Sequence, residues 1–368
     1  MRIACLNCGR PYPQSGTPYC CPVCSGVFDD IEPLRWRAAD PARAGIWRYA
    51  AAIGLSHRDV SLGEGHTPLL AANAFGRRVF LKCEHRNPTG SFKDRGTAAL
   101  IAFLLDRGVR EAIEDSSGNA GASFAAYSAR AGIGAQVYLP ETASGPKRAQ
   151  IEKYGAKVVP VPGMRSNATD AARMAADGGA TYASHAFLPH NLAGYATCAF
   201  EVAEELGTGP SAVLMPAGEG GFLLGMGRGF KALVDAEIIP AAPKLVGVQA
   251  ATCAPLVAAF ENGARGNHTV TEGDTAAEGV RVRMPVRLEA VLRMVRESGG
   301  QMVAVEEQFI EPGRVALAHQ GFYVEPTSAL VWRALEETLP ALPDPVVVVL
   351  TGSGYKVRAT QEKQWNAL

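Results

Sequence analysis

The sequence lacks any long apolar run, any excess of charge of one sign and any internal repeat. Its 36 basic and 36 acidic residues give a net charge of zero, which argues against a general surface for nucleic acid or membranes. Apolar stretches such as residues 346–350 are short, and others are interrupted by proline or charge, so none could cross a bilayer. Because residues 1–5 contain no apolar signal core, we expect a cytoplasmic protein.

The composition is that of an ordinary globular protein with room for two domains. The chain has 368 residues, of which 47% are hydrophobic and 20% charged, so a sizeable core can form. Its 40 glycines suit helices packed closely on a parallel sheet.

Cysteine is scarce except near the N-terminus, where two C-x-x-C turns occur. Four thiolates at this spacing fit one tetrahedral zinc ion, and the main alternative, a disulfide, is uncommon in the cytosol. Residues 1–30 are therefore predicted to form a zinc-ribbon-like segment held by structural zinc, because so small a segment has almost no core. The expected ligands are Cys5, Cys8, Cys21 and Cys24. Cys20 could replace Cys21 in another register, and Cys83, Cys198 and Cys253 are expected in the core.

The stretch N-P-T-G-S-F-K-D-R-G-T at residues 87–97 makes Lys93 a candidate catalytic amine. A strand is predicted at 79–84, a tight loop at 87–90, a helix cap at Ser91 and a helix at 92–107. The helix dipole and nearby apolar packing disfavour a protonated ammonium on the first turn, so Lys93 can be a nucleophilic amine. The alternative is an ordinary solvated charge at a helix start.

After this helix, strands and helices alternate, which is typical of doubly wound parallel sheets with ligands at the carboxyl ends of the strands. The region between residues 249 and 280 is less regular. Strands are predicted at 111–115, 135–139, 157–161, 212–215, 245–249, 302–305 and 346–350. Helices are predicted at 120–131, 147–154, 170–176, 192–206, 222–234, 287–297, 311–318 and 326–338.

Three predicted strand ends carry groups that can bind a ligand. The loop S-S-G-N at Ser116–Asn119 offers hydroxyls, a carboxamide and helix-start amides to a carboxylate, although it could also be a simple helix cap. The glycine loop P-A-G-E-G-G at 216–221 precedes a helix and can hold a phosphate, although glycine loops also serve helix packing. Thr351 places a hydroxyl after the wholly apolar strand at 346–350.

Together these features resemble the threonine synthases, in the tryptophan-synthase-β-like (fold type II) group of pyridoxal-phosphate enzymes. N-P-T-G-S-F-K-D-R-G is similar to the lysine motif of that family, and the further matches cover residues 62–356 in the family's order. They are E-G-H-T-P-L at 64–69, S-S-G-N at 116–119, V-G-V-Q-A at 246–250, V-E-P-T-S-A at 324–329 and T-G-S-G-Y-K at 351–356. A cysteine-rich ribbon also precedes the body of some relatives.

The resemblance implies a role for each motif residue. Lys93 would bind the cofactor covalently and act as the base at Cα, Asn119 would contact its phenolic oxygen, and Thr351 would meet its pyridine nitrogen. The cofactor phosphate would lie on the loop residues Gly218, Glu219, Gly220 and Gly221, and the substrate carboxylate on Ser116, Ser117, Gly118 and Ala120.

The resemblance also implies a domain plan and an assembly. The fold would be α/β, with two doubly wound, mostly parallel sheets behind the N-terminal zinc ribbon. A large cofactor domain would comprise residues 31–111 and 183–368, and residues 112–182 would form a small mobile domain that closes over the substrate. A homodimer acting on a small amino acid is expected, with no nucleic-acid or membrane partner.

The sequence departs from the family where a second substrate anion, the phosphate of O-phosphohomoserine, would bind. Ala120 replaces a threonine, Met164 replaces an asparagine, and Ala196 replaces the lysine of G-Q-K-T. Candidates for the missing positive charge are Arg165, Arg173, His185 and His190.

Three functions follow from these observations. The first is threonine synthesis, by γ-elimination of phosphate and water addition at Cβ. The second is another elimination, deamination or β-replacement on a serine-, threonine- or phosphoserine-like amino acid. The third is a non-catalytic protein that binds a metabolite.

Overall fold

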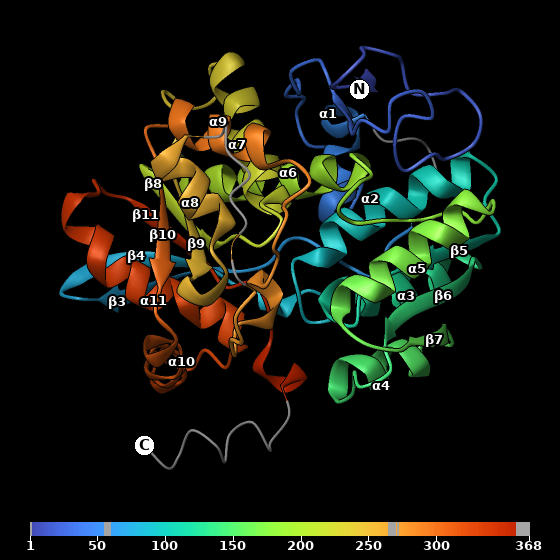
Figure 1. The fold of residues 1–368 in the computed structure, drawn as a ribbon. Helices are drawn as coiled ribbons and strands as arrows, with labels where there is room; N and C mark the ends of the chain where they lie inside the picture. The colour runs from blue at the N-terminus through green and yellow to red at the C-terminus, as the bar shows by residue number, and fades with distance from the viewer. Residues whose placement is uncertain (1, 55–59, 264–269, 271, 358–368) are drawn as a thin grey trace. The chain divides into compact units, whose positions relative to one another are not determined.

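Three sheets organise the chain (Figure 1), for which a computed structural model describes residues 2–54, 60–263, 270 and 272–357. The residues fall into two units. Unit 1 comprises Met1–Gly65, Asn87–Gly194 and Lys356–Arg358, and unit 2 comprises His66–Arg86, Tyr195–Tyr355 and Ala359–Leu368. Within the described ranges, no helix is both long enough and apolar enough to span a membrane.

Unit 2 is built on a six-stranded sheet in the order β10-β9-β8-β11-β4-β3. Its strands are β3 (Leu69–Ala74), β4 (Arg77–Lys82), β8 (Ala212–Pro216), β9 (Lys244–Ala250), β10 (Gln301–Val305) and β11 (Val346–Val349). All neighbours pair in parallel except β3, which pairs antiparallel with β4. The four valines of β11 are buried, as expected of a central parallel strand.

Helices cover this sheet and bury its apolar side chains. Helix α11 (Pro326–Thr338) packs on β8, β9 and β10, beside α10 (Ile310–His319), while α7 (Gly221–Asp235) packs on α9 (Leu288–Glu297) and β9. Helix α8 (Pro255–Asn262) lies in the region predicted to be irregular, so that prediction was wrong there. The bounds of α11 agree with the predicted helix at 326–338.

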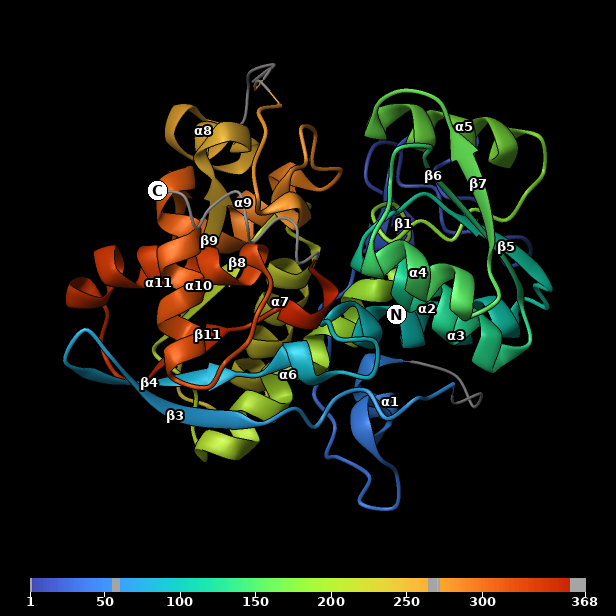
Figure 2. The ribbon, with the colours of Figure 1, turned by 90° about the horizontal axis from the view of Figure 1, so that it is seen from below.

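Unit 1 contains the three-stranded parallel sheet β5-β6-β7, which Figure 2 shows from another direction. The strands are β5 (Glu111–Glu114), β6 (Gly134–Pro140) and β7 (Lys157–Val161), and the helices are α1 (Ala50–Ile53), α2 (Lys93–Asp106), α3 (Asn119–Ala131), α4 (Pro146–Lys153) and α5 (Arg165–Asp177). Helix α5 begins at Arg165, five residues before the predicted helix at 170.

Helix α2 belongs to unit 1, whereas the predicted domain plan placed it in the large domain. It packs along α3, and the small side chains Ala98 and Ala102 of α2 share one core with Ala122 and Ala126 of α3. These alanines let the two helix backbones approach closely. The lysine helix and the S-S-G-N helix are therefore parts of one packed body.

The N-terminal segment also packs within unit 1. Its strands β1 (Ile3–Cys5) and β2 (Phe28–Asp30) pair antiparallel. The ring of Tyr12 lies 4.7 Å from that of Phe28 and 5.9 Å from that of Phe103 on α2. Arg107, which follows α2, donates to the Pro13 carbonyl oxygen at 2.8 Å. The segment therefore rests on the C-terminal end of α2.

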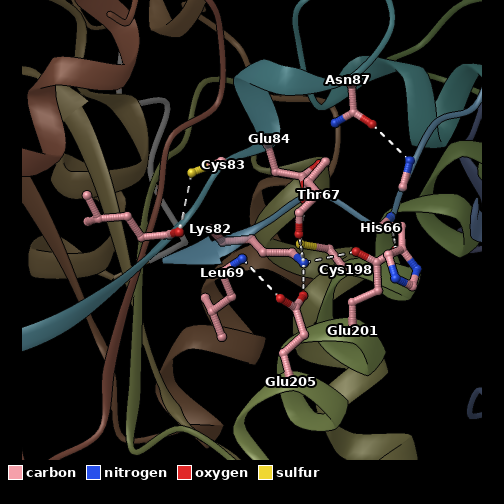
Figure 3. Close-up of polar contacts among 12 residues, drawn as sticks. His66, Thr67, Leu69, Lys82, Cys83, Glu84, Asn87, Cys198, Glu201 and Glu205 are labelled. Atoms are coloured by element: carbon pink, nitrogen blue, oxygen red, sulfur yellow. Dashed lines mark hydrogen bonds and ion pairs between the residues drawn. The ribbon is translucent and has the colours of Figure 1, made fainter. Parts of the chain in front are cut away.

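In unit 2 a buried lysine joins the sheet to α6 (His190–Leu206), as Figure 3 shows. Lys82 of β4 has no exposed side-chain area, and its Nζ lies 3.0 Å from Oε2 of Glu201 and 2.5 Å from Oε1 of Glu205. The third donor position reaches the Thr67 carbonyl oxygen at 2.6 Å. Because a buried charge is tolerated only when paired and hydrogen-bonded, this arrangement holds α6 against β4.

Candidate active site

Lys93 is the first residue of α2, and its neighbour Asp94 holds the preceding loop in place. The buried Asp94 carboxylate accepts hydrogen bonds from the Thr89 amide at 2.7 Å and the Thr89 hydroxyl at 2.6 Å. It also accepts one from the Ser123 hydroxyl of α3 at 2.7 Å. Burial raises the pKa of Asp94, against the effect of these donors and of Lys356. Asp94 thereby positions the residue beside it.

The predicted cap at Ser91 was wrong. The N-cap of α2 is Phe92, without a side-chain cap hydrogen bond, and the buried Ser91 hydroxyl has no partner in the part of the chain that is described. Lys93 is half-buried, with Nζ 5.1 Å from the centre of the Phe92 ring. The positive end of the α2 dipole therefore lies at the lysine.

The S-S-G-N loop does not cap its own helix with side chains. The N-cap of α3 is Gly118, a residue without a side chain that could cap the helix. The Ser116 hydroxyl instead accepts from the Gly118 amide at 3.2 Å. A Cβ on Gly121 would collide with the Ser116 carbonyl oxygen, so the loop folds tightly onto the helix. The start of α3 remains suited to a carboxylate.

Two buried carboxylates directly precede this loop, each with its own basic partner. Asp115 accepts from Arg165 at 3.1 Å and from Thr169 at 2.5 Å, and Glu114 lies 2.5 Å from Nδ1 of His185. Burial raises the pKa of Glu114, opposed by the positive charge of His185. For Asp115 burial also acts upward, but Arg165 and His185 together bring its pKa below the ordinary value.

The four side chains considered for a second anion site all have partners within unit 1. Arg165 and His185 serve the two carboxylates. His190 stacks on Phe103 with ring centres 3.5 Å apart, and the Arg173 guanidinium lies 5.8 Å from the Phe187 ring. Arg165 and His185 are therefore paired with carboxylates, whereas Arg173 and His190 contact aromatic rings.

The glycine loop connects β8 to α7 within unit 2. Gly220, the N-cap of α7, has φ +74°, and no side chain caps the helix. A Cβ would lie 2.8 Å from the Gly279 carbonyl oxygen at Gly218, and 2.7 Å from Val291 Cγ2 at Gly220. The Glu219 carboxylate accepts from the Val286 amide at 3.0 Å. Glu219 can therefore offer a ligand its backbone while its side chain holds the loop.

Thr351 follows β11 and is 2% exposed. Its hydroxyl lies 3.0 Å from that of Ser328 on α11, which also accepts from the Gly352 amide at 2.8 Å. Ser328 belongs to the V-E-P-T-S-A motif, but its role in orienting Thr351 was not predicted. The pair presents a neutral hydroxyl at the carboxyl end of the strand.

Four cysteines near the N-terminus lie close together. The Sγ atoms of Cys5 and Cys24 are 3.5 Å apart, those of Cys8 and Cys21 are 3.7 Å apart, and all four lie within 4.8 Å of one another. Tetrahedral zinc with Zn–S bonds of about 2.3 Å requires sulfurs about 3.8 Å apart. The Val23 amide lowers the pKa of the Cys21 thiol to about 7. Cys20 lies outside the cluster.

The fold is that of an α/β protein in which a lysine amine lies at the start of one helix and a glycine loop at the start of another. The chain belongs to the pyridoxal-phosphate dependent enzymes, whose family model matches residues 60–352. It is 33% identical to the threonine synthase of Methanocaldococcus jannaschii, covering 97% of this chain and 95% of the relative. Identity to the threonine synthase of Mycobacterium leprae is 32%, covering 86% and 89%.

Solved structures share the fold. A threonine deaminase from the organism abbreviated T.th. is 29% identical with a TM-score of 0.69, covering 79% of this chain and 94% of the other. The L-serine ammonia-lyase of Rhizomucor miehei is 20% identical with a TM-score of 0.72, covering 84% and 99%. The predicted membership of the fold type II, threonine synthase-like group and the predicted class, a pyridoxal-phosphate-dependent lyase, are confirmed.

The described residues fit the cofactor chemically. Lys93 supplies an amine at a helix start, and the glycine loop supplies a helix start that no side chain caps. Neighbouring atoms fill the Cβ positions of Gly218 and Gly220, so only glycine lets the loop backbone run there and face a phosphate. The neutral Thr351 hydroxyl suits a pyridine nitrogen that need not be protonated.

Proposed function

We propose that this enzyme acts as a threonine synthase, releasing phosphate from O-phosphohomoserine and adding water at Cβ. The observation that carries the proposal is the fixed position of Lys93, with Asp94 bonded to Thr89 and Ser123 around it. Two curated threonine synthases that match most of the chain at 32–33% identity support the same substrate class.

In this proposal each motif residue has one task. Pyridoxal phosphate, when bound, withdraws electrons from Cα of the amino acid. Lys93 holds the cofactor and moves the Cα proton, while Ser116, Ser117, Gly118 and Ala120 orient the substrate carboxylate through the start of α3. On the cofactor side, Asn119 binds the phenolic oxygen and Thr351 the pyridine nitrogen. The backbone of Gly218, Glu219, Gly220 and Gly221 would hold the phosphate group of the cofactor.

A second candidate is deamination of a hydroxy amino acid such as L-threonine. The observation that favours it is the internal pairing of Arg165 and His185, which leaves less positive charge for a substrate phosphate. The 29% identity to a threonine deaminase is in keeping with it.

One assay separates the two candidates. Cofactor-loaded protein is given O-phosphohomoserine or L-threonine, and phosphate, threonine and 2-oxo acid are measured, with Lys93→Ala as the control. Phosphate together with threonine supports the synthase. A 2-oxo acid from L-threonine without phosphate release supports the deaminase, and activity that survives in Lys93→Ala contradicts both.

We further propose that Cys5, Cys8, Cys21 and Cys24 bind one structural zinc ion. Their sulfur spacing is close to that of a tetrahedral thiolate site. Metal analysis of purified protein is expected to find about one zinc per chain. Cys21→Ser should lose the metal, whereas Cys20→Ser, an adjacent thiol outside the cluster, should retain it.

We also propose a cytoplasmic homodimer and a closing motion of residues 112–182 over the substrate. Both rest on the family resemblance. Sedimentation of the holoenzyme tests the first, and hydrogen exchange in that segment with and without substrate tests the second. A monomer, or exchange unchanged by substrate, would contradict them.

A further inference from the structure

Glu114 and His185 form a carboxylate–imidazole pair to which none of the roles above gives a task. Nδ1 of His185 lies 2.5 Å from Oε1 of Glu114. The Glu114 side chain is 1% exposed, whereas that of His185 is 18% exposed. A carboxylate on Nδ1 fixes the orientation and tautomer of an imidazole. Within the described part of the chain, Nδ1 is the ring nitrogen that is hydrogen-bonded, so Nε2 is left to exchange a proton.

The second oxygen of the same carboxylate points away from a purely structural pair. Oε2 of Glu114 is buried and has no hydrogen-bond partner among the described residues. Leaving a buried acceptor unpaired weakens a fold, and such costs recur at functional sites. The Glu114 carboxylate therefore orients His185 although its unpaired oxygen lowers the stability of the fold.

The pair lies at the edge of the sheet that carries the S-S-G-N loop. Residues 181–183 run parallel to β5, with the Ile113 amide donating to the Thr181 carbonyl oxygen at 2.8 Å and the Ala183 amide to that of Ile113 at 2.8 Å. Strand β5 and residues 181–183 therefore end at the same edge of the sheet. The chain continues from β5 to Ser116 and from residue 183 to His185. Ligands of parallel sheets bind at this edge.

The backbone of His185 is fixed from both sides. The Ser184 hydroxyl accepts from the amides of Ala186 and Phe187 at 3.4 and 3.3 Å. Asn191 donates from Nδ2 to the His185 carbonyl oxygen at 3.0 Å. An imidazole held by its backbone and by Nδ1 is preorganised for proton transfer.

The other charged groups around the pair are already balanced. Arg165 of α5 lies 3.1 Å from Asp115, and Thr169 donates to the same carboxylate. The buried phenol of Tyr182 is another titratable neighbour, and the charges of Asp115 and Glu114 help burial raise its pKa far above the ordinary value. Although oxygens of Glu114 and Asp115 lie within 4.8 Å of the ring nitrogen of His185, the guanidinium disfavours a metal cation there.

We propose that His185 is a second catalytic acid–base group, which acts on the oxygen attached to Cβ of the substrate, with Glu114 as its positioning residue. The inference rests on the proposed elimination and addition chemistry, and it applies to both candidate reactions. In dehydration, Lys93 takes the Cα proton, the Cβ–O bond breaks with its electron pair on oxygen, and Nε2 of His185 protonates that oxygen to give water. In hydration, Nε2 takes the proton of the water that attacks Cβ, and Lys93 returns a proton to Cα.

The test compares a leaving group that needs a proton with one that does not. Wild-type holoenzyme and His185→Gln are given L-threonine, L-serine and 3-chloro-L-alanine, and 2-oxo acid formation is measured. In His185→Gln, kcat for the two hydroxy amino acids should fall on the order of 100-fold or more. Elimination of chloride should stay within about threefold, because chloride leaves as an anion without protonation.

Several outcomes overturn the proposal. Equal losses for hydroxyl and chloride would mean that His185 only supports the fold. Turnover of 3-chloro-L-alanine by a wild-type protein inactive on both hydroxy amino acids would mean that no acid serves the Cβ oxygen. Failure of the proposed function itself has a different result. Either Lys93→Ala still eliminates chloride from 3-chloro-L-alanine, or the wild type does not eliminate it at all.

Two further variants keep the result interpretable. Glu114→Gln retains an acceptor for Nδ1 and should lower hydroxyl elimination selectively, even if His185→Gln folds poorly. His319→Gln removes an exposed histidine of α10 and should behave as wild type. Independently of activity, proton NMR should show a downfield Nδ1 proton that disappears in His185→Gln, and its absence from the wild type would contradict the pair.

Discussion

Lys356 donates a hydrogen bond from its buried ammonium to the carbonyl oxygen of Thr89, at a distance of 2.7 Å. Thr89 in turn donates to Asp94, next to Lys93. The last residue of the T-G-S-G-Y-K motif therefore fixes the loop that begins the lysine motif. Two sequence patterns far apart in the chain share one structural task within unit 1.

Replacing Lys356 by methionine should loosen this loop. The Thr89 carbonyl oxygen would lose its donor and Asp94 a nearby positive charge, which we expect to lower the free energy of unfolding by about 1–3 kcal/mol. Affinity for pyridoxal phosphate should fall as well. Chemical denaturation and cofactor titration measure the two effects, and Lys356→Arg, which keeps the charge, is the matched control. Equal cofactor affinity in both variants would contradict this role.

Glu64 should make the stability of the protein depend on pH. Its buried carboxylate accepts from Trp47 Nε1 at 2.9 Å and from the Tyr127 hydroxyl at 2.7 Å. Burial nevertheless raises its pKa above the ordinary value of 4.5. A raised pKa favours the folded state below the unfolded pKa, and this contribution is lost as pH rises through the folded value.

The free energy of unfolding of the wild type should therefore decline relative to that of Glu64→Gln as pH rises above 4.5. Urea denaturation at a series of pH values measures this difference. A difference that does not change with pH would show that Glu64 ionises alike in the folded and unfolded chains.

Lys82 provides a test of the ion pairs that it forms in unit 2, with the buried Glu201 and the partly exposed Glu205. Lys82→Met leaves Glu201 and Glu205 without their cation, so we expect a loss of about 3–5 kcal/mol in the free energy of unfolding. Removing one charge as well, in Lys82→Met with Glu201→Gln, should recover part of that loss. If the loss of unfolding free energy in the double variant equals the sum of the losses in Lys82→Met and in Glu201→Gln, the two residues are not coupled.

Two variants of Thr351 test whether its hydroxyl contributes to cofactor affinity. Thr351→Ser keeps the oxygen near Ser328, while Thr351→Val keeps the shape and removes the oxygen. We expect cofactor affinity to fall about tenfold in the valine variant, as for the loss of one hydrogen bond worth about 1.4 kcal/mol, and to change little in the serine variant. Equal affinities would exclude a role of this hydroxyl in cofactor binding.

Regular elements with strong local patterns were predictable from the sequence. Strand β7 (Lys157–Val161) and helix α11 (Pro326–Thr338) have the predicted bounds. In α11 the apolar periodicity agrees with the burial of its residues, whereas in β7 the run of valines marks the strand although none of its residues is fully buried. Strand β3 (Leu69–Ala74) was missed, since L-L-A-A-N-A lacks the β-branched and aromatic residues that mark a strand. Its pairing with β4 decides its structure.

The parts of the candidate site that were not predictable depend on residues distant in sequence. Glu114 and His185 are separated by 71 positions, and no local pattern indicates that residues 181–183 run beside β5. Asp94 belongs to a motif that the sequence reveals, but its hydrogen bond with Ser123 depends on the packing of α2 against α3. Local sequence patterns predicted the helices and loops that carry the candidate site residues, whereas tertiary packing determined which polar side chains contact them.

The contact of Tyr12 with Phe103 has a practical consequence for anyone who shortens the protein. A recombinant form that starts after residue 30 would lose the ring that covers Phe103 and His190, leaving an aromatic surface exposed to water. Such surfaces promote self-association. The N-terminal segment therefore also shields the aromatic end of α2 from water, and an affinity tag is better tolerated before it than in its place.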